Sequence, residues 1–291
     1  MPTNVLRPPL RCAARVAVRR ALPGMLALSA DIGHSSGAAL ALIGQLDALP
    51  PLVRDAACAG ACLAGALAWI GLWTQLARSG AVSSTLSRKM VHVGSAPLFV
   101  LVWPFFSSAA SARLLASAVP ALNAVRLLLA ARPPDGGGAG DGIVAAVSRS
   151  GERGEILKGP FIYVLVLLAA TLLCWRDSPV GVVALCQMAV GDGLADIAGR
   201  RFGKNNKWPF APSKSVAGSL AFVLGATAAS LGLLSWLGVW GCLSPLPADA
   251  PARLLLISVM CASVELLPTQ LVDDNVSVPL AAAALMLLLL P

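Results

Sequence analysis

The chain has 291 residues, of which 57% are hydrophobic and only 12% are charged, with a formal net charge of +8. A soluble globular domain usually carries about 25% charged residues, so the composition argues against a soluble enzyme and favours a protein with several membrane spans. Leu, Ala and Val dominate the apolar runs, and short segments of alternating polarity are missing, which argues against a transmembrane β-barrel. The predicted fold class is therefore all-α, a helical bundle in a membrane.

The N-terminal segment differs from the rest of the chain in its charges. Residues 1–30 contain five arginines but neither lysine nor any acid. Arg-rich, acid-poor N-termini are typical of organelle transit peptides, whereas a secretory signal needs an apolar stretch that arginines do not interrupt. Residues 1–50 are predicted to be a disordered transit peptide, and residues 51–291 the membrane domain. A basic tail that is never removed is the alternative, and composition does not distinguish a plastid address from a mitochondrial one.

Eight apolar segments follow, and each predicts a helix. Spanning the hydrocarbon core takes about 20 residues, so most segments suffice and the second, fourth and last are short. The prediction is about eight transmembrane helices, with seven to nine acceptable. The segments are Leu52–Ala77, Met90–Phe106, Leu114–Ala131, Pro160–Trp175, Pro179–Gly199, Val216–Trp240, Leu254–Leu271 and Val276–Leu290.

Lysine and arginine are spread unevenly over the connections between these segments. All five lysines and most arginines lie in connections that follow odd-numbered segments, whereas the other connections hold only Arg113, Arg176 and Arg253. By the positive-inside rule the basic side should face the stroma or cytosol. The polar motifs described next all fall on this side.

Two carboxylates, Asp192 and Asp196, close the fifth segment. At positions i and i+4 they lie on one helix face, one turn apart. Two like charges this close are unfavourable unless a cation lies between them, and Mg²⁺ takes one or two carboxylates together with water and phosphate oxygens. The pair predicts a Mg²⁺ site; two solvated acids at a helix end are the alternative.

The stretch GRRFGKNNKWPFAPSKSVAGS that follows combines glycines with cations. Glycine allows close backbone approach, and the helix that starts at Lys214 and Ser215 offers free N–H groups to an anion. The pattern GxxxxGK[ST] is absent and no strand is expected before this helix, so this is not a P-loop. The candidate nucleotide- and phosphate-binding residues are Gly193, Arg200, Gly203, Lys204, Lys207, Ser215 and Gly218.

A third cluster, VDDN, places Asp273, Asp274 and Asn275 between the last two segments. One aspartate can accept the proton of an attacking hydroxyl, or both can bind metal; an Asx-rich turn is the alternative. Glu265 lies in an apolar segment, where an ionisable residue is either functional or a buried structural acid.

The second segment opens with Arg88, Lys89 and His92. Lys89 and His92 are three residues apart and can face one site, although ordinary anchoring explains them equally well. Together with the acids above, these are candidate contacts to substrate or phosphate: Arg88, Lys89, His92, Lys158, Glu265 and Asn275.

Five motifs occur in a fixed order, and together they resemble the polyprenol kinase family, most closely its plant phytol kinase branch, over residues 86–290. The motifs are SRKMVHVGSAPLFVLVWPFFS, GERGEILKGPFIYVL, GDGLADIAGRRFG, KSVAGSLAF and VELLPTQLVDDNVSVPL. The stretch from GRRFGK to PSKSVAGS is also similar to the signature of CDP-diacylglycerol synthases, which bind CTP. Val216 departs from the family pattern, where an aromatic residue tends to follow KS.

The resemblance implies a multi-span chloroplast membrane kinase that phosphorylates phytol, or a related isoprenoid alcohol such as farnesol or geranylgeraniol, with CTP as donor, for tocopherol synthesis. Asp192 and Asp196 would then hold Mg²⁺ and the nucleotide phosphates, Lys214 would neutralise developing charge with Lys204 and Arg200, and Asp273 or Asp274 would be a second metal ligand or the base. The partners implied are the alcohol drawn from the bilayer, the nucleotide and the lipid membrane. No nucleic-acid partner is expected, and the sequence identifies no protein partner.

Two other functions use the same features. A cytidylyltransferase acting on a lipid phosphate would employ the same CTP site and release pyrophosphate. A transporter would use the acids as ion sites, but such acids belong near mid-span in repeated halves, whereas here they lie at segment ends in a chain without internal repeats.

Overall fold

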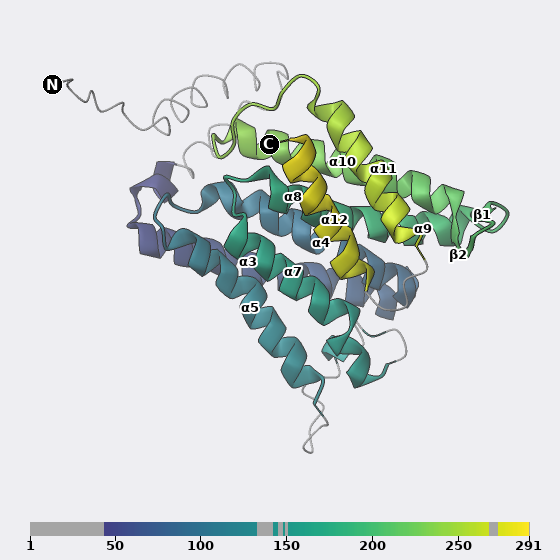
Figure 1. Cartoon of the computed structure of the whole chain (residues 1–291). Coiled ribbons are helices and arrows are strands. Elements are labelled where there is room, and N and C mark those ends of the chain that lie inside the picture. Colours follow the sequence, from purple (N-terminus) through teal and green to yellow (C-terminus); the bar gives the residue numbers. More distant parts are fainter. Residues whose placement is uncertain (1–43, 133–141, 145–147, 149–150, 268–272, 291) are drawn as a thin grey trace, which may run out of the picture.

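The computed structural model describes residues 44–132, 142–144, 148, 151–267 and 273–290. The predicted transit peptide therefore lies outside the described residues, apart from positions 44–50. The described chain folds into a bundle of helices with one small hairpin (Figure 1). The main helices are α3 (Pro51–Arg78), α4 (Ser84–Val102), α5 (Ala112–Ala130), α7 (Gly159–Leu173), α8 (Pro179–Cys186), α9 (Asp192–Phe202), α10 (Val216–Val239), α11 (Ala250–Glu265) and α12 (Asp274–Leu289).

The predicted all-α class is confirmed, and each of the eight apolar segments is helical over most of its length. Within the described residues, five helical stretches are long and apolar enough to cross a membrane, and α12 is a shorter apolar helix. The five are Pro51–Arg78, Ala112–Ala130, Arg153–Leu173, Pro179–Phe202 and Val216–Val239.

The second helix begins earlier than predicted. The hydroxyl of Ser83 accepts a hydrogen bond from the backbone N–H of Leu86 at 3.2 Å and so caps α4, which starts at Ser84 instead of Met90. A serine at this position satisfies an N–H group that has no partner inside the helix. As a result Lys89 and His92 lie within the second and third turns of α4, and not at its start.

The centre of the bundle is one continuous helical rod made of α8, the π-helical segment η3 (Gln187–Gly191) and α9. Nearly every residue from 181 to 193 is buried, because this stretch is apolar apart from Gln187 and Asp192, and α4, α10 and α12 pack around it. Across η3, the N–H of Asp192 donates to the carbonyl of Gln187, five residues back. Short π-helical segments often occur at functional sites, and η3 ends directly before Asp192.

A short antiparallel hairpin, β1 (Lys207–Trp208) with β2 (Ala211–Ser215), leads directly into α10 and lies at one end of the bundle (Figure 1). The expectation that no strand precedes this helix is therefore wrong. The N–H of Val216 donates to the carbonyl of Asn206 at 2.8 Å and closes the hairpin onto the start of α10. The hairpin is the one sheet in the described residues, and the GxxxxGK[ST] pattern of a P-loop remains absent.

Glycines allow the central rod to pack closely against the neighbouring helices. A Cβ atom added at Gly193 would lie 2.2 Å from Cγ2 of Val93 on α4, and one added at Gly225 would lie 2.3 Å from Cδ1 of Leu194. Small residues let membrane helices approach closely enough for their backbones to pack. Gly193 thus sets the spacing between α9 and α4, which carry opposing charged residues.

We predict that Gly193→Ala lowers the melting temperature of the detergent-solubilised protein, because overpacking a tight contact costs about 1–3 kcal/mol. Trimming the partner in Gly193→Ala/Val93→Ala should recover much of this loss, with Val93→Ala alone as the matched control. A single variant as stable as the parent, or losses that simply add in the double variant, would contradict the packing role.

Candidate functional site

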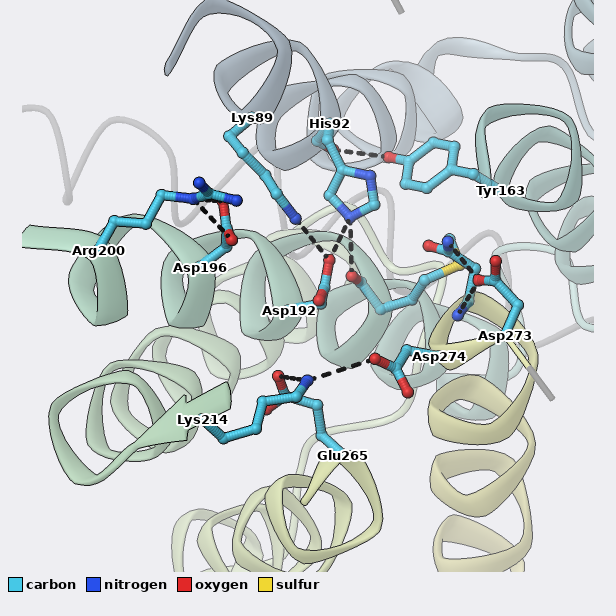
Figure 2. Close-up of polar contacts among 12 residues, drawn as sticks. Lys89, His92, Tyr163, Asp192, Asp196, Arg200, Lys214, Glu265, Asp273 and Asp274 are labelled. Carbon is cyan, nitrogen blue, oxygen red and sulfur yellow. Dashed lines mark hydrogen bonds and ion pairs between the residues drawn. The ribbon is translucent and has the colours of Figure 1, made fainter. Parts of the chain in front are cut away.

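Charged side chains from separate parts of the chain lie close together in the folded protein (Figure 2). They come from α4, α9, α11, α12 and the strand β2, and α7 contributes a tyrosine. The labelled set is Lys89, His92, Tyr163, Asp192, Asp196, Arg200, Lys214, Glu265, Asp273 and Asp274.

Asp192 is the acid that faces α4. Its Oδ2 lies 3.2 Å from Nζ of Lys89 and 3.3 Å from Nε2 of His92. The same Nε2 lies 3.1 Å from the carbonyl oxygen of Met188. Both neighbours of Nε2 are acceptors, so this nitrogen carries the proton and donates. Two donors on α4 therefore hold the Asp192 carboxylate in its charged form.

Tyr163 fixes the helix that carries these donors. Its hydroxyl accepts from the N–H of Ala96 at 3.0 Å and donates to the carbonyl of His92 at 2.9 Å, so it is inserted between two groups that would otherwise bond each other within α4. The imidazole of His92 also packs on the phenol ring, with centroids 4.6 Å apart. A side chain inserted into a helix ladder is a recognised cause of bending, and Pro97, which lacks an N–H, follows at the next residue.

Sequence reasoning missed Tyr163. The available signal was that it is the single tyrosine of the chain and lies in the motif GPFIYVL. Its hydroxyl partners are backbone groups 67 and 71 residues away. Nothing in the pattern of residues predicts such contacts.

Lys214 forms a second charged group with two acids. Its Nζ lies 2.6 Å from Oε1 of Glu265 and 3.3 Å from Oδ2 of Asp274. Burial alone would lower the pKa of the Lys214 ammonium, but Glu265, through its charge and hydrogen bond, together with Asp274 and Asp192, raises that pKa above its ordinary value. Lys214 is therefore a cation at neutral pH, with Glu265 buried beneath it.

Three carboxylates are close enough to hold one metal ion. Asp192, Glu265 and Asp274 each offer an oxygen, and these oxygens lie within 4.8 Å of one another. Oxygen ligands in this number suit Mg²⁺, which completes its shell with water or phosphate oxygens. The set includes Asp192 but not Asp196, although the sequence pattern pairs those two.

Asp196 instead pairs with a cation on its own helix. Its carboxylate accepts from Nε of Arg200 at 2.9 Å, and the Arg200 side chain is 61% exposed. Ion pairs this exposed contribute little to stability, so both groups can be drawn to another partner without unfolding the helix. Asp196 still faces the same cavity as Asp192.

Asp273 caps helix α12. Its Oδ1 accepts from the backbone N–H of Asn275 at 2.9 Å and from the side-chain amide of Asn275 at 2.7 Å. A short acid before the first helical turn satisfies N–H groups that lack helical partners. The other oxygen, Oδ2, makes no hydrogen bond within the described residues.

The candidate phosphate-binding glycines and Ser215 form the contact between α9 and α10. The Ser215 hydroxyl accepts from the N–H of Gly218 at 3.1 Å and caps α10. A Cβ added at Gly203 would lie 2.3 Å from this hydroxyl oxygen, and one at Gly218 would lie 2.9 Å from the carbonyl oxygen of Ala195. These glycines let two helices touch, and Gly193 does the same against α4.

The remaining basic candidates are dispersed. Lys204 and Lys207 are exposed on the turn and hairpin after α9. Arg88 donates to the carbonyl of Ser148 at 2.6 Å and Lys158 lies at the start of α7, and both line the cavity described next.

A cavity of about 820 Å³ opens onto the charged cluster. It lies within the range of about 300–1,000 Å³ typical of ligand sites. Its charged and amide lining residues are Arg88, Lys89, His92, Asn123, Glu155, Lys158, Asp192, Asp196, Arg200, Asp273, Asp274 and Asn275. Lys214 is paired with Asp274, which lines the cavity. The same cavity has apolar walls from α3, α5 and α7, so one space joins charged and apolar surfaces.

Comparison with known proteins finds relatives that are named as phytol kinases or as a farnesol kinase. It is 39% identical over 289 residues to "Probable phytol kinase, chloroplastic" of Triticum aestivum, which covers 99% of this chain and 94% of that protein. It is 38% identical to "Phytol kinase 1, chloroplastic" of Arabidopsis thaliana, over 82% of this chain and 78% of the relative. It is 37% identical to "Farnesol kinase, chloroplastic" of the same plant, over 75% and 70%.

No family model matches the chain, and no solved structure is similar to it. The likeness to the relatives nevertheless includes the segments that carry the cluster, because the longest of these matches spans 99% of the chain. Identity at this level over nearly complete sequences establishes common descent and a common fold. The chain belongs to the family of phytol kinases and farnesol kinases.

Proposed function

We propose that this chain is a membrane kinase that transfers the terminal phosphate of CTP to the hydroxyl of phytol or a related isoprenoid alcohol. The observation that carries the proposal is the convergence of Asp192, its donors Lys89 and His92, and the Lys214 group on a cavity with apolar walls. An amphiphilic alcohol requires this combination, because its hydroxyl must meet charged phosphates while its chain stays out of water. The names of the relatives support the same activity.

The reaction is a single displacement at phosphorus. The hydroxyl oxygen of the alcohol attacks the γ-phosphorus of CTP, a new P–O bond forms, and the bond from the γ-phosphorus to the β,γ-bridging oxygen breaks to release CDP. Such transfer depends mainly on positioning and on neutralising phosphate charge. Lys89, Arg200 and Lys214 supply that neutralisation, each already next to a carboxylate in this cluster.

Asp273 is the candidate acceptor of the hydroxyl proton. It lines the cavity and keeps Oδ2 available, because only Oδ1 is used in capping α12. A general base must come within hydrogen-bond reach of the proton it removes. Asp274, the other candidate from the VDDN motif, has its Oδ2 next to Lys214.

Asp192, Glu265 and Asp274 fit a divalent cation, with Asp196 as a further ligand one turn from Asp192. When bound, Mg²⁺ would neutralise and orient the nucleotide phosphates. Lys214 lies beside two of these acids and partly offsets their negative charge. CTP as donor and a role in tocopherol synthesis follow from the family resemblance.

The location is proposed to be a chloroplast membrane, with all eight helical segments crossing or entering the bilayer. The lysines and most arginines of the connections would lie on one face, the stromal or cytosolic side, as the positive-inside rule requires. Lys89, Lys158, Lys204, Lys207 and Lys214 all belong to this face. The cluster would then meet soluble nucleotide at the membrane boundary.

We predict that the purified chain, in vesicles containing phytol, converts CTP to CDP and forms phytyl phosphate. Testing each of CTP, UTP and ATP with each of phytol, farnesol and geranylgeraniol measures the preference for nucleotide and the preference for alcohol in one assay. Release of pyrophosphate in place of CDP would assign the cytidylyltransferase reaction. Movement of alcohol without nucleotide consumption would assign transport, and either outcome overturns the proposal.

We predict that Asp192→Asn and Lys214→Ala each lower turnover about 100-fold or more, the size of loss seen when one preorganised charge partner is removed from an active site. The control is Asp249→Asn, at the far end of α11 from Glu265, where the acid is paired with Arg253 on the surface. Each variant is checked for an unchanged elution profile in detergent. Near-normal turnover of both site variants would show that the chemistry occurs elsewhere.

A further inference from the structure

The cavity continues from the charged cluster into the apolar part of the bundle. Beyond the acids and cations, its walls are formed by Ile70, Leu127, Ile162, Val164 and Leu167. These side chains come from α3, α5 and α7, and α4 also contributes to the lining. The cavity therefore offers both charged groups and hydrocarbon.

Residues along helix α7 show in which direction the cavity extends. At its start, a Cβ added to Gly159 would lie 3.4 Å from Nδ2 of Asn275 and 3.9 Å from Oδ2 of Asp273, so this end lies beside the VDDN motif. Tyr163, one turn on, contacts His92, and Leu167 follows after one further turn. At 1.5 Å per residue, Leu167 lies about 12 Å along the helix from Gly159. Because all three residues line the cavity, it extends roughly that far from the acids.

Ser95, Asn123 and Leu167, which line the cavity on α4, α5 and α7, carry no charge. Ser95 of α4 turns its hydroxyl back onto the carbonyl of Val91 at 2.6 Å and so presents no unsatisfied donor. Asn123 contributes an amide. Leu167, only 6% exposed, belongs to the main core and forms part of the deep wall.

We propose that this apolar extension holds the isoprenyl chain of the alcohol, with the hydroxyl at the Asp192 end, and that Leu167 limits the chain length accepted. The proposal rests on the kinase function and specifies which part of the substrate each end of the cavity recognises. Length selection is the physical role because the chain already lies in hydrocarbon before it binds. Burial from water then contributes little, and van der Waals packing discriminates between alcohols.

The test is the ratio of kcat/KM for geranylgeraniol to that for farnesol, two alcohols that differ by one isoprene unit. Leu167→Trp fills the deep end, and we expect the ratio to fall about tenfold or more, the discrimination that steric fit in an apolar pocket provides. Leu165→Trp is the matched control: it lies on the same helix, is 41% exposed, and faces away from the cavity. The control should change the ratio by less than about twofold, as surface changes do.

An unchanged ratio in Leu167→Trp, or an equal shift in Leu165→Trp, overturns the proposal while leaving the kinase function intact. If Leu167→Trp has lost all activity, a second experiment on the unmodified chain tests the proposal. The protein is photolabelled with an isoprenoid alcohol that carries a diazirine at its tail end. Labelling of the α5 and α7 peptides around Asn123 and Leu167, suppressed by excess phytol, supports the cavity. Labelling that is confined to residues on the outer faces of the helices, such as Leu165, contradicts it. Labelling in the cavity without any turnover would instead contradict the kinase function alone.

Discussion

The contact between Lys89 and Asp192 joins two parts of the chain 103 residues apart, and the rest of the site depends on it. Three features bring these groups together. The π-helical segment η3 ends directly before Asp192, Gly193 lets α9 approach α4, and the Tyr163 hydroxyl bonds to α4 at the carbonyl of His92. All three features adjoin the buried apolar rod α8–η3. Packing in the centre of the bundle therefore determines where the charged side chains lie.

Charge balance is the second constraint. In an apolar bundle an unpaired charge is costly, and removing one partner of a buried pair typically costs about 3–5 kcal/mol. Here four of the acids lie next to cations: Asp192 next to Lys89, Asp196 next to Arg200, and Glu265 and Asp274 both next to Lys214. The same cations suit nucleotide phosphates, and the same acids suit a divalent ion. The arrangement that makes the bundle stable therefore also provides a site for phosphoryl transfer, next to a cavity that suits an isoprenoid chain.

Much of this could be predicted from the sequence, because hydropathy and the charge pattern depend on local composition. Eight helical segments and the acids and cations around Asp192, Lys214 and Asp274 follow from apolar runs and from polar residues at their ends. The start of α4 was misplaced because a serine cap outweighed hydropathy, and the hairpin before α10 was missed because its short strands have no apolar alternation. The role of Tyr163 and the grouping of Glu265 with Asp192 depend on contacts between distant segments. Helical spacing predicted Asp196 as the neighbour of Asp192, whereas tertiary packing brings Glu265 and Asp274 to it.

The most direct test of this account is a double-mutant cycle on turnover with Lys89→Met, Asp192→Asn and the two combined. If the two side chains act as one unit, removing the second after the first costs little. The account predicts that the double variant is about as active as Asp192→Asn alone. Losses that multiply independently would contradict it, because the contact between Lys89 and Asp192 would then contribute nothing to turnover.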